Sequence, residues 1–260
     1  MAPRIEYFTY PMDVLIYPLL VLAGFCAGFI NTLAGAGSVI SLAVLNLAGL
    51  PLNVANGTNR VAILLQTAVG VGRFRKQGKL EIRPHIGIIL SAVAGGILGA
   101  LIAGQVSGAV LRRSIGACMA LTLIPLFLNP TRWLEGNPER EKKKAGPTQL
   151  ITFFLIGIYG GYVQLGVGVF LLTALVLATG LDLVRGNAVK LLIAFCYIVP
   201  ALAIFVMNDL VRWDLGLTLA CGNMLGAWTA THEAARRGAP FIRWLLIGVV
   251  ILSSIRYLFF

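Results

Sequence analysis

The chain has 260 residues, of which 58% are hydrophobic and only 12% are Asp, Glu, Lys or Arg, and its mean hydropathy is +0.87. Soluble domains carry roughly 25% charged residues, so this composition argues against a soluble globular enzyme, a disordered chain and a nucleic-acid-binding domain. In a membrane protein, the formal net charge of +11 indicates basic loops on the cytoplasmic side of the bilayer.

Ten apolar segments follow one another along the chain. Most are long enough for a membrane-spanning helix, which needs about 20 apolar residues. The second and seventh segments are shorter and glycine-flanked, and such segments are stable in a bilayer only where protein or a cavity satisfies their backbone. Whether they cross fully or re-enter is left open. The segments span approximately 14–34, 37–50, 54–72, 86–104, 107–128, 148–163, 167–180, 186–206, 214–233 and 240–258.

The distribution of Lys and Arg predicts the orientation in the membrane. If the N-terminus is outside and every segment counts as a crossing, 13 basic residues fall inside and 5 fall outside. The inside residues lie in the loops 73–85 and 129–147 and around the turn with Arg236 and Arg237. Because basic loops favour the cytoplasmic side, we expect outside termini and a multi-pass protein of the cell inner membrane.

The chain also contains an internal repeat. The stretch GFCAGFINTLAGAG at 24–37 resembles GIYGGYVQLGVG at 157–168 once a two-residue gap is allowed. The match then continues at a constant offset of 131 residues, which aligns Gly35 with Gly166, Gly37 with Gly168 and Asn56 with Asn187. With five segments in each copy, the second copy must enter the membrane from the opposite side, as in secondary transporters built from inverted repeats.

The predicted fold is an all-α integral membrane protein made of two inverted repeats of about five helical segments each. The first membrane repeat covers 1–128, a cytoplasmic basic linker covers 129–147, and the second membrane repeat covers 148–260. Short broken or re-entrant helices are expected at the repeat interface, where transporters of this plan bind their substrates near the middle of the membrane.

Polar side chains gather at the two breaks, and polar groups inside membrane segments are functional candidates because they are costly to bury. Most are uncharged donors or cations, a set that suits a small oxyanion. Helices that begin after Gly37, near Asn56, after Gly168 and near Asn187 would direct free N–H groups inward. The predicted substrate-binding residues are Asn31, Gly35, Gly37, Ser38, Asn56, Thr58, Asn59, Arg60, Gln164, Gly166, Gly168, Asn187 and Lys190.

Several of these residues have a second interpretation. Asn56, Thr58 and Asn187 could cap helix starts, and Arg60 could extend its guanidinium to the outer surface. Lys190 lies deeper in its segment and is harder to explain in this way.

Two further polar pairs stay open in function. Arg185 could flank the inner surface or pair with Asp182, the only carboxylate near the breaks. His232 and Glu233 could form an interfacial pair or a proton relay.

No catalytic, metal or cofactor site is expected. The four cysteines lie in apolar stretches without a Cys-x-x-Cys pair or a Cys/His cluster, so neither a disulfide framework nor a zinc site is indicated. An intramembrane protease would have only Ser38 and a distant histidine to use.

The two signatures, GFxAGFINTLAGAGS…GLPLNVANGTNRVAILLQ and GGYVQLGVGVFLL…GLDLVRGNAVKLLI, resemble the TauE/SafE-like sulfite exporter family, also called the toluene sulfonate uptake permease family. The resemblance covers about residues 14–258. It implies a carrier of the prokaryotic inner membrane for sulfite, sulfonates, sulfoacetate or related organic anions. This chain departs from the family where Ala34, Ala36 and Ser41 interrupt the glycine-rich run, and where Lys190 ends a stretch that often reads Gly-Thr-Ser.

We therefore expect a secondary transporter, an exporter or permease for a small sulfur-containing or organic anion, that works by alternating access. A passive anion channel is the main alternative, since pores also use dipole ends and cations; an intramembrane enzyme and a scaffold are less favoured. The expected partners are the small anion and the lipid bilayer, not nucleic acid. A coupling proton or ion, and the choice between monomer and homodimer, are left open.

Overall fold

The computed structural model describes residues 13–106, 110, 114, 137–141 and 145–259. Every regular element in these ranges is a helix, which confirms the predicted all-α class. Within the described residues, three helices are long and apolar enough to cross a membrane, namely Leu15–Leu33, Arg83–Gln105 and Leu183–Met207. The fifth predicted segment, 107–128, lies almost entirely outside the described residues.

The elements follow the predicted apolar segments closely. The first half contains α1 (Asp13–Leu33), α2 (Ser38–Leu47), α3 (Leu52–Lys76), the 3-10 turn η1 (Arg83–His85) and α4 (Ile86–Gln105). The second half contains the short α7 (Pro138–Glu141), α8 (Pro147–Tyr162), α9 (Val167–Thr179), α10 (Leu183–Met207) and α11 (Trp213–Phe259). Helix α11 is kinked at Gly238, whose φ of 69° and ψ of −163° are not helical, so it includes both the ninth and the tenth segments.

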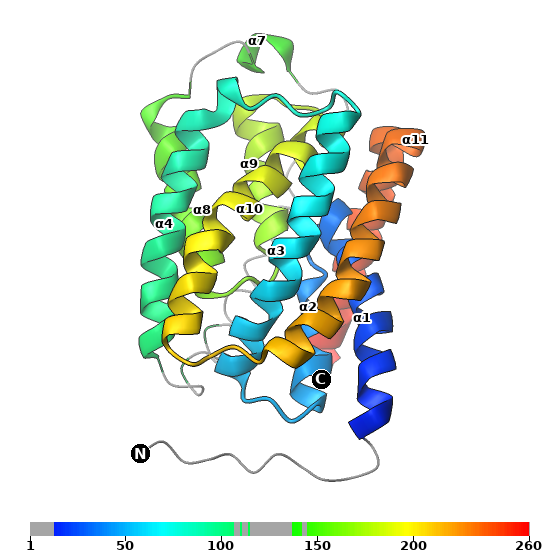
Figure 1. Ribbon diagram of the computed structural model, residues 1–260. Helices are drawn as coiled ribbons and strands as arrows, with labels where there is room; N and C mark the ends of the chain where they lie inside the picture. Colours follow the sequence, from blue (N-terminus) through cyan, green and yellow to red (C-terminus); the bar gives the residue numbers. More distant parts are fainter. Residues whose placement is uncertain (1–12, 107–109, 111–113, 115–136, 142–144, 260) are drawn as a thin grey trace.

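The first two helices form a hairpin that enters the bundle from one end and returns to the same end (Figure 1). Leu20, near the start of α1, packs in one cluster with Leu45 and Leu50, at and just beyond the end of α2, and with Ala55 at the start of α3. Helix α2 therefore runs back along α1, and the segment 37–50 re-enters instead of crossing.

Helices α8 and α9 form a second hairpin, which enters from the opposite end (Figure 1). Gln149, in the first turn of α8, donates from Nε2 to the carbonyl oxygen of Ala178 at the end of α9, over 2.5 Å. Asn137, next to α7, donates its backbone N–H to the carbonyl oxygen of Gly180 just beyond α9. The segment 167–180 is thus also re-entrant.

The tips of the two hairpins meet at glycines. Gly35, after α1, and Gly166, before α9, both have positive φ, 77° and 70°, a conformation that glycine adopts without a steric penalty. A Cβ atom on Gly168 would clash with the Cα of Gly35, and a Cβ on Gly35 would clash with the backbone of Gly168. The backbones of the two halves therefore approach each other as closely as glycine permits.

The long helices hold each hairpin through small residues. Helix α1 packs along α11, where Gly28 lies against the backbone of Asn223, and α8 packs along α4, where Gly99 lies against the carbonyl oxygen of Ile158. Close backbone approach through glycine is the usual way that membrane helices associate. Helices α3 and α10 run beside the tips and complete the interior.

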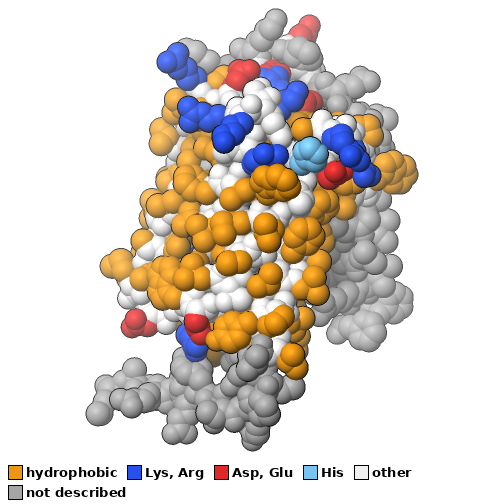
Figure 2. Space-filling view, turned by 45° about the vertical axis from the view of Figure 1, so that its right-hand side comes forward, with side chains coloured by type: hydrophobic (Ala, Val, Ile, Leu, Met, Phe, Trp, Pro, Cys, Tyr) orange, Lys and Arg blue, Asp and Glu red, His pale blue; other side chains and the backbone are white. Residues whose placement is uncertain are grey.

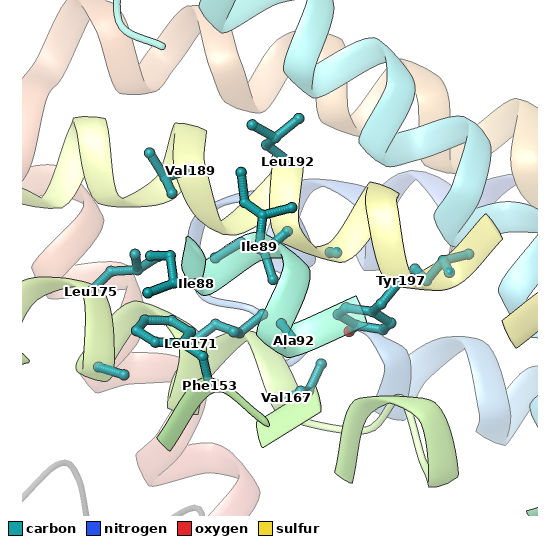
Figure 3. Packing of buried hydrophobic residues seen from close by; sticks show 14 of the residues in the cluster. Ile88, Ile89, Ala92, Phe153, Val167, Leu171, Leu175, Val189, Leu192 and Tyr197 are labelled. Carbon is teal, nitrogen blue, oxygen red and sulfur yellow. The ribbon is translucent and has the colours of Figure 1, made fainter. Parts of the chain in front are cut away.

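The second hairpin is packed between α4 and α10 (Figure 3). Phe153 of α8 and Leu171 and Leu175 of α9 belong to the same buried cluster as Ile88 of α4 and Val189 of α10. Because these large side chains fill the space around the hairpin, its tip is held in a fixed position inside the bundle.

The surface has the layering of a membrane protein. Hydrophobic side chains cover the middle of the face shown in Figure 2, and Lys and Arg gather at one end, near the turn between α3 and α4. We call this the basic end; it includes the exposed residues Arg75, Lys76, Lys79, Arg83 and Arg236. The second hairpin enters from the basic end and the first from the opposite end.

The contact between the tips makes a prediction about stability. In Gly168→Ala, the new methyl group meets the backbone of Gly35, so we expect a loss of about 1–3 kcal/mol and a lower melting temperature in detergent. Gly72→Ala is the matched control, because a Cβ at Gly72 of α3 would meet nothing within 4 Å. Equal melting temperatures for wild type and Gly168→Ala would contradict the close approach of the tips.

Candidate functional site

A small cavity of about 20 Å³ lies where the hairpin tips meet α3 and α10. A polar cavity needs roughly 10–15 Å³ to hold one water, so this conformation has room for water but not for a tetrahedral oxyanion. The cavity is lined by residues from both halves. Its polar or glycine lining consists of Asn31, Gly35, Gln66, Thr67, Gln164, Gly168 and Lys190.

Lys190 reaches this cavity from the second turn of α10 and is 2% exposed. Its Nζ donates to the carbonyl oxygens of Asn31 and Thr32, over 3.2 and 2.8 Å, and to Oδ1 of Asn187, over 2.6 Å. An ammonium group has three donors, and all three are used here. The two carbonyls belong to the last turn of α1, so the cation binds the broken end of the first hairpin.

Arg60 occupies the corresponding place on α3 and is fully buried, which shows that its predicted alternative, extension to the outer surface, is wrong. Its guanidinium donates to the carbonyl oxygens of Gly160, Gly161 and Tyr162, over 3.3, 2.6 and 3.5 Å. Its Cζ lies 4.3 Å from the centroid of the Phe205 ring, a cation–π contact. Arg60 does not line the cavity.

Neither cation has a carboxylate partner within the part of the chain that the structure describes. Each lies instead at the C-terminal end of a broken helix, where backbone carbonyls lack helical partners and carry partial negative charge. The carbonyls hold the cations by charge–dipole attraction, but they supply less than one full negative charge per helix end. The centre of the bundle therefore keeps a net positive charge among its described groups.

Gln66 links α3 to the first hairpin and to α11. Its Oε1 accepts from Nδ2 of Asn31, over 3.2 Å, and from Nδ2 of Asn223, over 3.3 Å, while its Nε2 donates to Oγ1 of Thr32, over 3.3 Å. Sequence reasoning missed Gln66, Thr67 and Asn223. Their polarity within the apolar segments 54–72 and 214–233 was the signal that could have found them.

In the second half, Tyr197 stands 131 residues after Gln66. Its hydroxyl is paired with the side-chain amide of Gln164, over 2.9 and 3.1 Å. Each long interior helix therefore binds the polar side chain of its own half's hairpin from the same position in the repeat.

Of the residues predicted from the sequence, Asn31, Gly35, Gln164, Gly168 and Lys190 line the cavity together. The others surround it. Gly37 packs against Ala27 and Asn31 of α1, and Gly166 begins α9 in the left-handed conformation. Asn187 accepts from Lys190, as described above.

The expected helix starts near Asn56 and Asn187 are wrong. Helix α3 begins at Leu52 and α10 at Leu183, so both side chains lie inside helices and cap neither. Asn56 donates from Nδ2 to the carbonyl oxygen of Tyr162, over 3.0 Å.

Three further predicted residues lie inside the protein away from the cavity lining. Oγ1 of Thr58 accepts from the backbone N–H of Arg212, over 3.0 Å, so it faces the start of α11. Ser38 Oγ and both side-chain polar atoms of Asn59 are buried without a hydrogen-bond partner in the described structure.

At the basic end, the interpretation of Arg185 as a partner of Asp182 is wrong. Asp182 caps α10 by accepting from the backbone N–H groups of Val184 and Arg185. The guanidinium of Arg185 instead pairs with Glu141, over 2.5 Å, and with Glu81, over 3.3 Å. This ion pair joins α10 to α7 and to the turn between α3 and α4, and it lies apart from the cavity.

The second open pair is divided between two partners. Glu233 pairs with Arg237, over 2.5 Å, and His232 stacks on Trp228 with 6.4 Å between ring centroids. Among the described residues, no group of three or more His, Cys, Asp or Glu side chains could hold a metal ion.

The family model for the sulfite exporter TauE/SafE matches residues 20–257. The chain belongs to the TauE/SafE sulfite exporter family. Together with the apolar helices, this membership identifies a multi-pass membrane transporter rather than an enzyme, and the resemblance inferred from the two signatures is confirmed.

Curated relatives cover almost the whole chain. A Sinorhizobium sp. protein named probable membrane transporter protein ORF9 is 29% identical over 240 residues, 92% of this chain and 91% of that protein. A Haemophilus influenzae probable membrane transporter protein is 25% identical over 244 residues, 93% of this chain and 94% of its own length. The Escherichia coli K12 protein YfcA, named a probable membrane transporter protein, is 24% identical over 251 residues, 96% and 92% of the two chains. No solved structure matches the chain.

The Gln66 network makes the second prediction. Gln66→Leu keeps the side chain's approximate size but removes its hydrogen bonds to Asn31, Thr32 and Asn223, which leaves buried polar groups unsatisfied. We expect a loss of about 1–3 kcal/mol, measured as a lower melting temperature in detergent. Gln77→Leu is the control, because Gln77 makes one long hydrogen bond, 3.4 Å to the carbonyl oxygen of Thr231. Equal losses in the two variants would contradict a special role for Gln66.

Proposed function

We propose that this TauE/SafE transporter is a secondary carrier of the inner membrane that moves a small sulfur-containing or organic anion, such as sulfite, a sulfonate or sulfoacetate. One observation carries the proposal. Arg60 and Lys190 are 0% and 2% exposed, lie at the broken helix ends, and have no acidic partner among the described residues.

The charge of the site favours an anion. Buried charges are costly unless they are compensated, and two helix ends compensate two cations only in part. An anion bound at the cavity would supply the missing negative charge. Asn31, Gln66, Thr67 and Gln164 add uncharged polar groups around Lys190, and their N–H and O–H donors suit the oxygens of a sulfite, sulfonate or carboxylate.

The arrangement of the hairpins favours alternating access of two inverted repeats. One hairpin enters from each end of the bundle, and their tips touch at Gly35 and Gly168. With the tips in contact, the cavity is too small for the anion. Opening toward either end requires one hairpin and the helices around it to move relative to the other. The two units would be the repeats 1–128 and 148–260, joined by the basic linker 129–147.

Binding is tested with purified protein by a thermal-shift screen of sulfite, sulfate, taurine, sulfoacetate and simple carboxylates. An anion at a hundred times its Kd stabilises the protein by about 2.7 kcal/mol, which corresponds to roughly 5–10 °C for a chain of this size. We expect Lys190→Ala to lose this shift. Lys76→Ala, which removes an exposed lysine at the basic end, should keep it.

If none of these anions raises the melting temperature of the wild-type protein, the proposed substrate class is wrong. Transport is then measured in proteoliposomes. A carrier shows saturable uptake and counterflow, whereas the alternative function, a passive anion channel, shows neither. Uptake that rises linearly with concentration and gives no counterflow would contradict alternating access.

A further inference from the structure

The two buried cations are exchanged between the halves. Arg60 belongs to α3 in the first half but binds the end of α8 in the second half. Lys190 belongs to α10 in the second half but binds the end of α1 in the first half.

The register of this exchange follows the repeat. Lys190 binds the carbonyls of Asn31 and Thr32, and Arg60 binds those of Gly160 and Gly161. Both acceptor pairs are separated by 129 residues, which is the repeat offset on the near side of the two-residue gap. Two cations of different chemistry thus bind equivalent backbone atoms from nearly equivalent helix positions.

We infer that Arg60 and Lys190 are exchanged clamps with different roles: anion binding releases the clamp at Lys190, and Arg60 is a positioning residue that holds the second hairpin throughout. This inference rests on the proposed function. It assigns substrate contact to Lys190 but not to Arg60, and it makes the first hairpin the moving one.

The difference follows from the bonds that each cation makes. Lys190 lines the cavity, and its three donors are already used. An anion that binds Nζ directly must replace one of these acceptors. Two of the three are the carbonyls of Asn31 and Thr32, so replacing them frees the end of α1 from α10. The third acceptor, Asn187, lies on the same helix as Lys190 and holds the ammonium near its present position.

Arg60 has no such exposure to the anion. Its guanidinium lies over Phe205 and contacts three carbonyls at the end of α8. Asn56, one turn earlier on α3, adds a further hydrogen bond to Tyr162. Because the cavity does not reach Arg60, anion binding leaves this clamp in place.

Hydrogen exchange followed by mass spectrometry tests the clamps in full-length protein without any anion ligand. Exchange reports local opening, and the peptides to follow cover the two tips, 31–37 and 160–168. We expect Arg60→Gln to speed exchange about tenfold at 160–168 only, and Lys190→Gln to do so at 31–37 only, since charge-assisted hydrogen bonds are lost. Arg60→Lys, which keeps the charge and some donors, should restore part of the protection.

Arg73→Gln is the matched control, because Arg73 also lies on α3 with its Cζ over an aromatic ring, 4.9 Å from the centroid of Trp228, but belongs to neither clamp. It should leave exchange at both tips unchanged. Unchanged exchange at 160–168 in Arg60→Gln would overturn the clamp assignment, and so would a uniform increase across the whole bundle.

Sulfite is the probe for the release step. In wild-type protein, saturating sulfite should speed exchange at 31–37 and leave 160–168 unchanged. In transport assays, Arg60→Gln should keep its KM within about twofold while the maximal rate falls, and Lys190→Gln should raise KM. A large rise of KM in Arg60→Gln would overturn the positioning role. If no anion stabilises the wild-type protein, the proposed function and the release step both fail, whereas the exchange measured without anion still decides on the clamps.

Discussion

A helix that ends in the middle of a membrane leaves carbonyl groups without hydrogen-bond donors, and no bulk water is present to supply them. The bundle has two such ends, at α1 and α8, and it meets the need with two side chains that would be equally costly to bury alone. Lys190 binds the end of α1, and Arg60 binds the end of α8. Each buried cation and each broken helix end therefore stabilises the other.

This mutual compensation is incomplete, and the remainder gives the site its chemistry. A helix end carries about half of an elementary charge, so two ends leave two cations with roughly one positive charge in excess. The described residues near the cavity add amide and hydroxyl groups but no carboxylate. The same backbone breaks that make a cavity possible also make it suited to an anion, and a site of this kind has little affinity for a cation.

The sequence predicted the all-α class, the apolar segments and the two breaks, because hydropathy and glycine spacing act locally. It left open that 37–50 and 167–180 re-enter, since a short apolar helix reads the same whether it turns back or crosses. It misplaced the starts of α3 and α10, where Pro51 and Asp182 hold the N-cap positions and not the asparagines one turn later. It also missed Gln66 and the ion pairs of Arg185, because pairing across a bundle depends on tertiary contacts that spacing along the chain does not encode.

The repeat is symmetric in its backbone and asymmetric in its chemistry. Lys190 aligns with Asn59, whose amide is buried without a hydrogen-bond partner in the described structure, and Ser38 and Ser41 align with Val169 and Leu172. The first half thus offers uncharged polar groups where the second offers a lysine among apolar side chains. Because an anion would meet different charge and polarity in the two halves, the states open to the two sides of the membrane differ in energy even though the scaffold is repeated. This difference gives a symmetric framework a preferred direction of anion release.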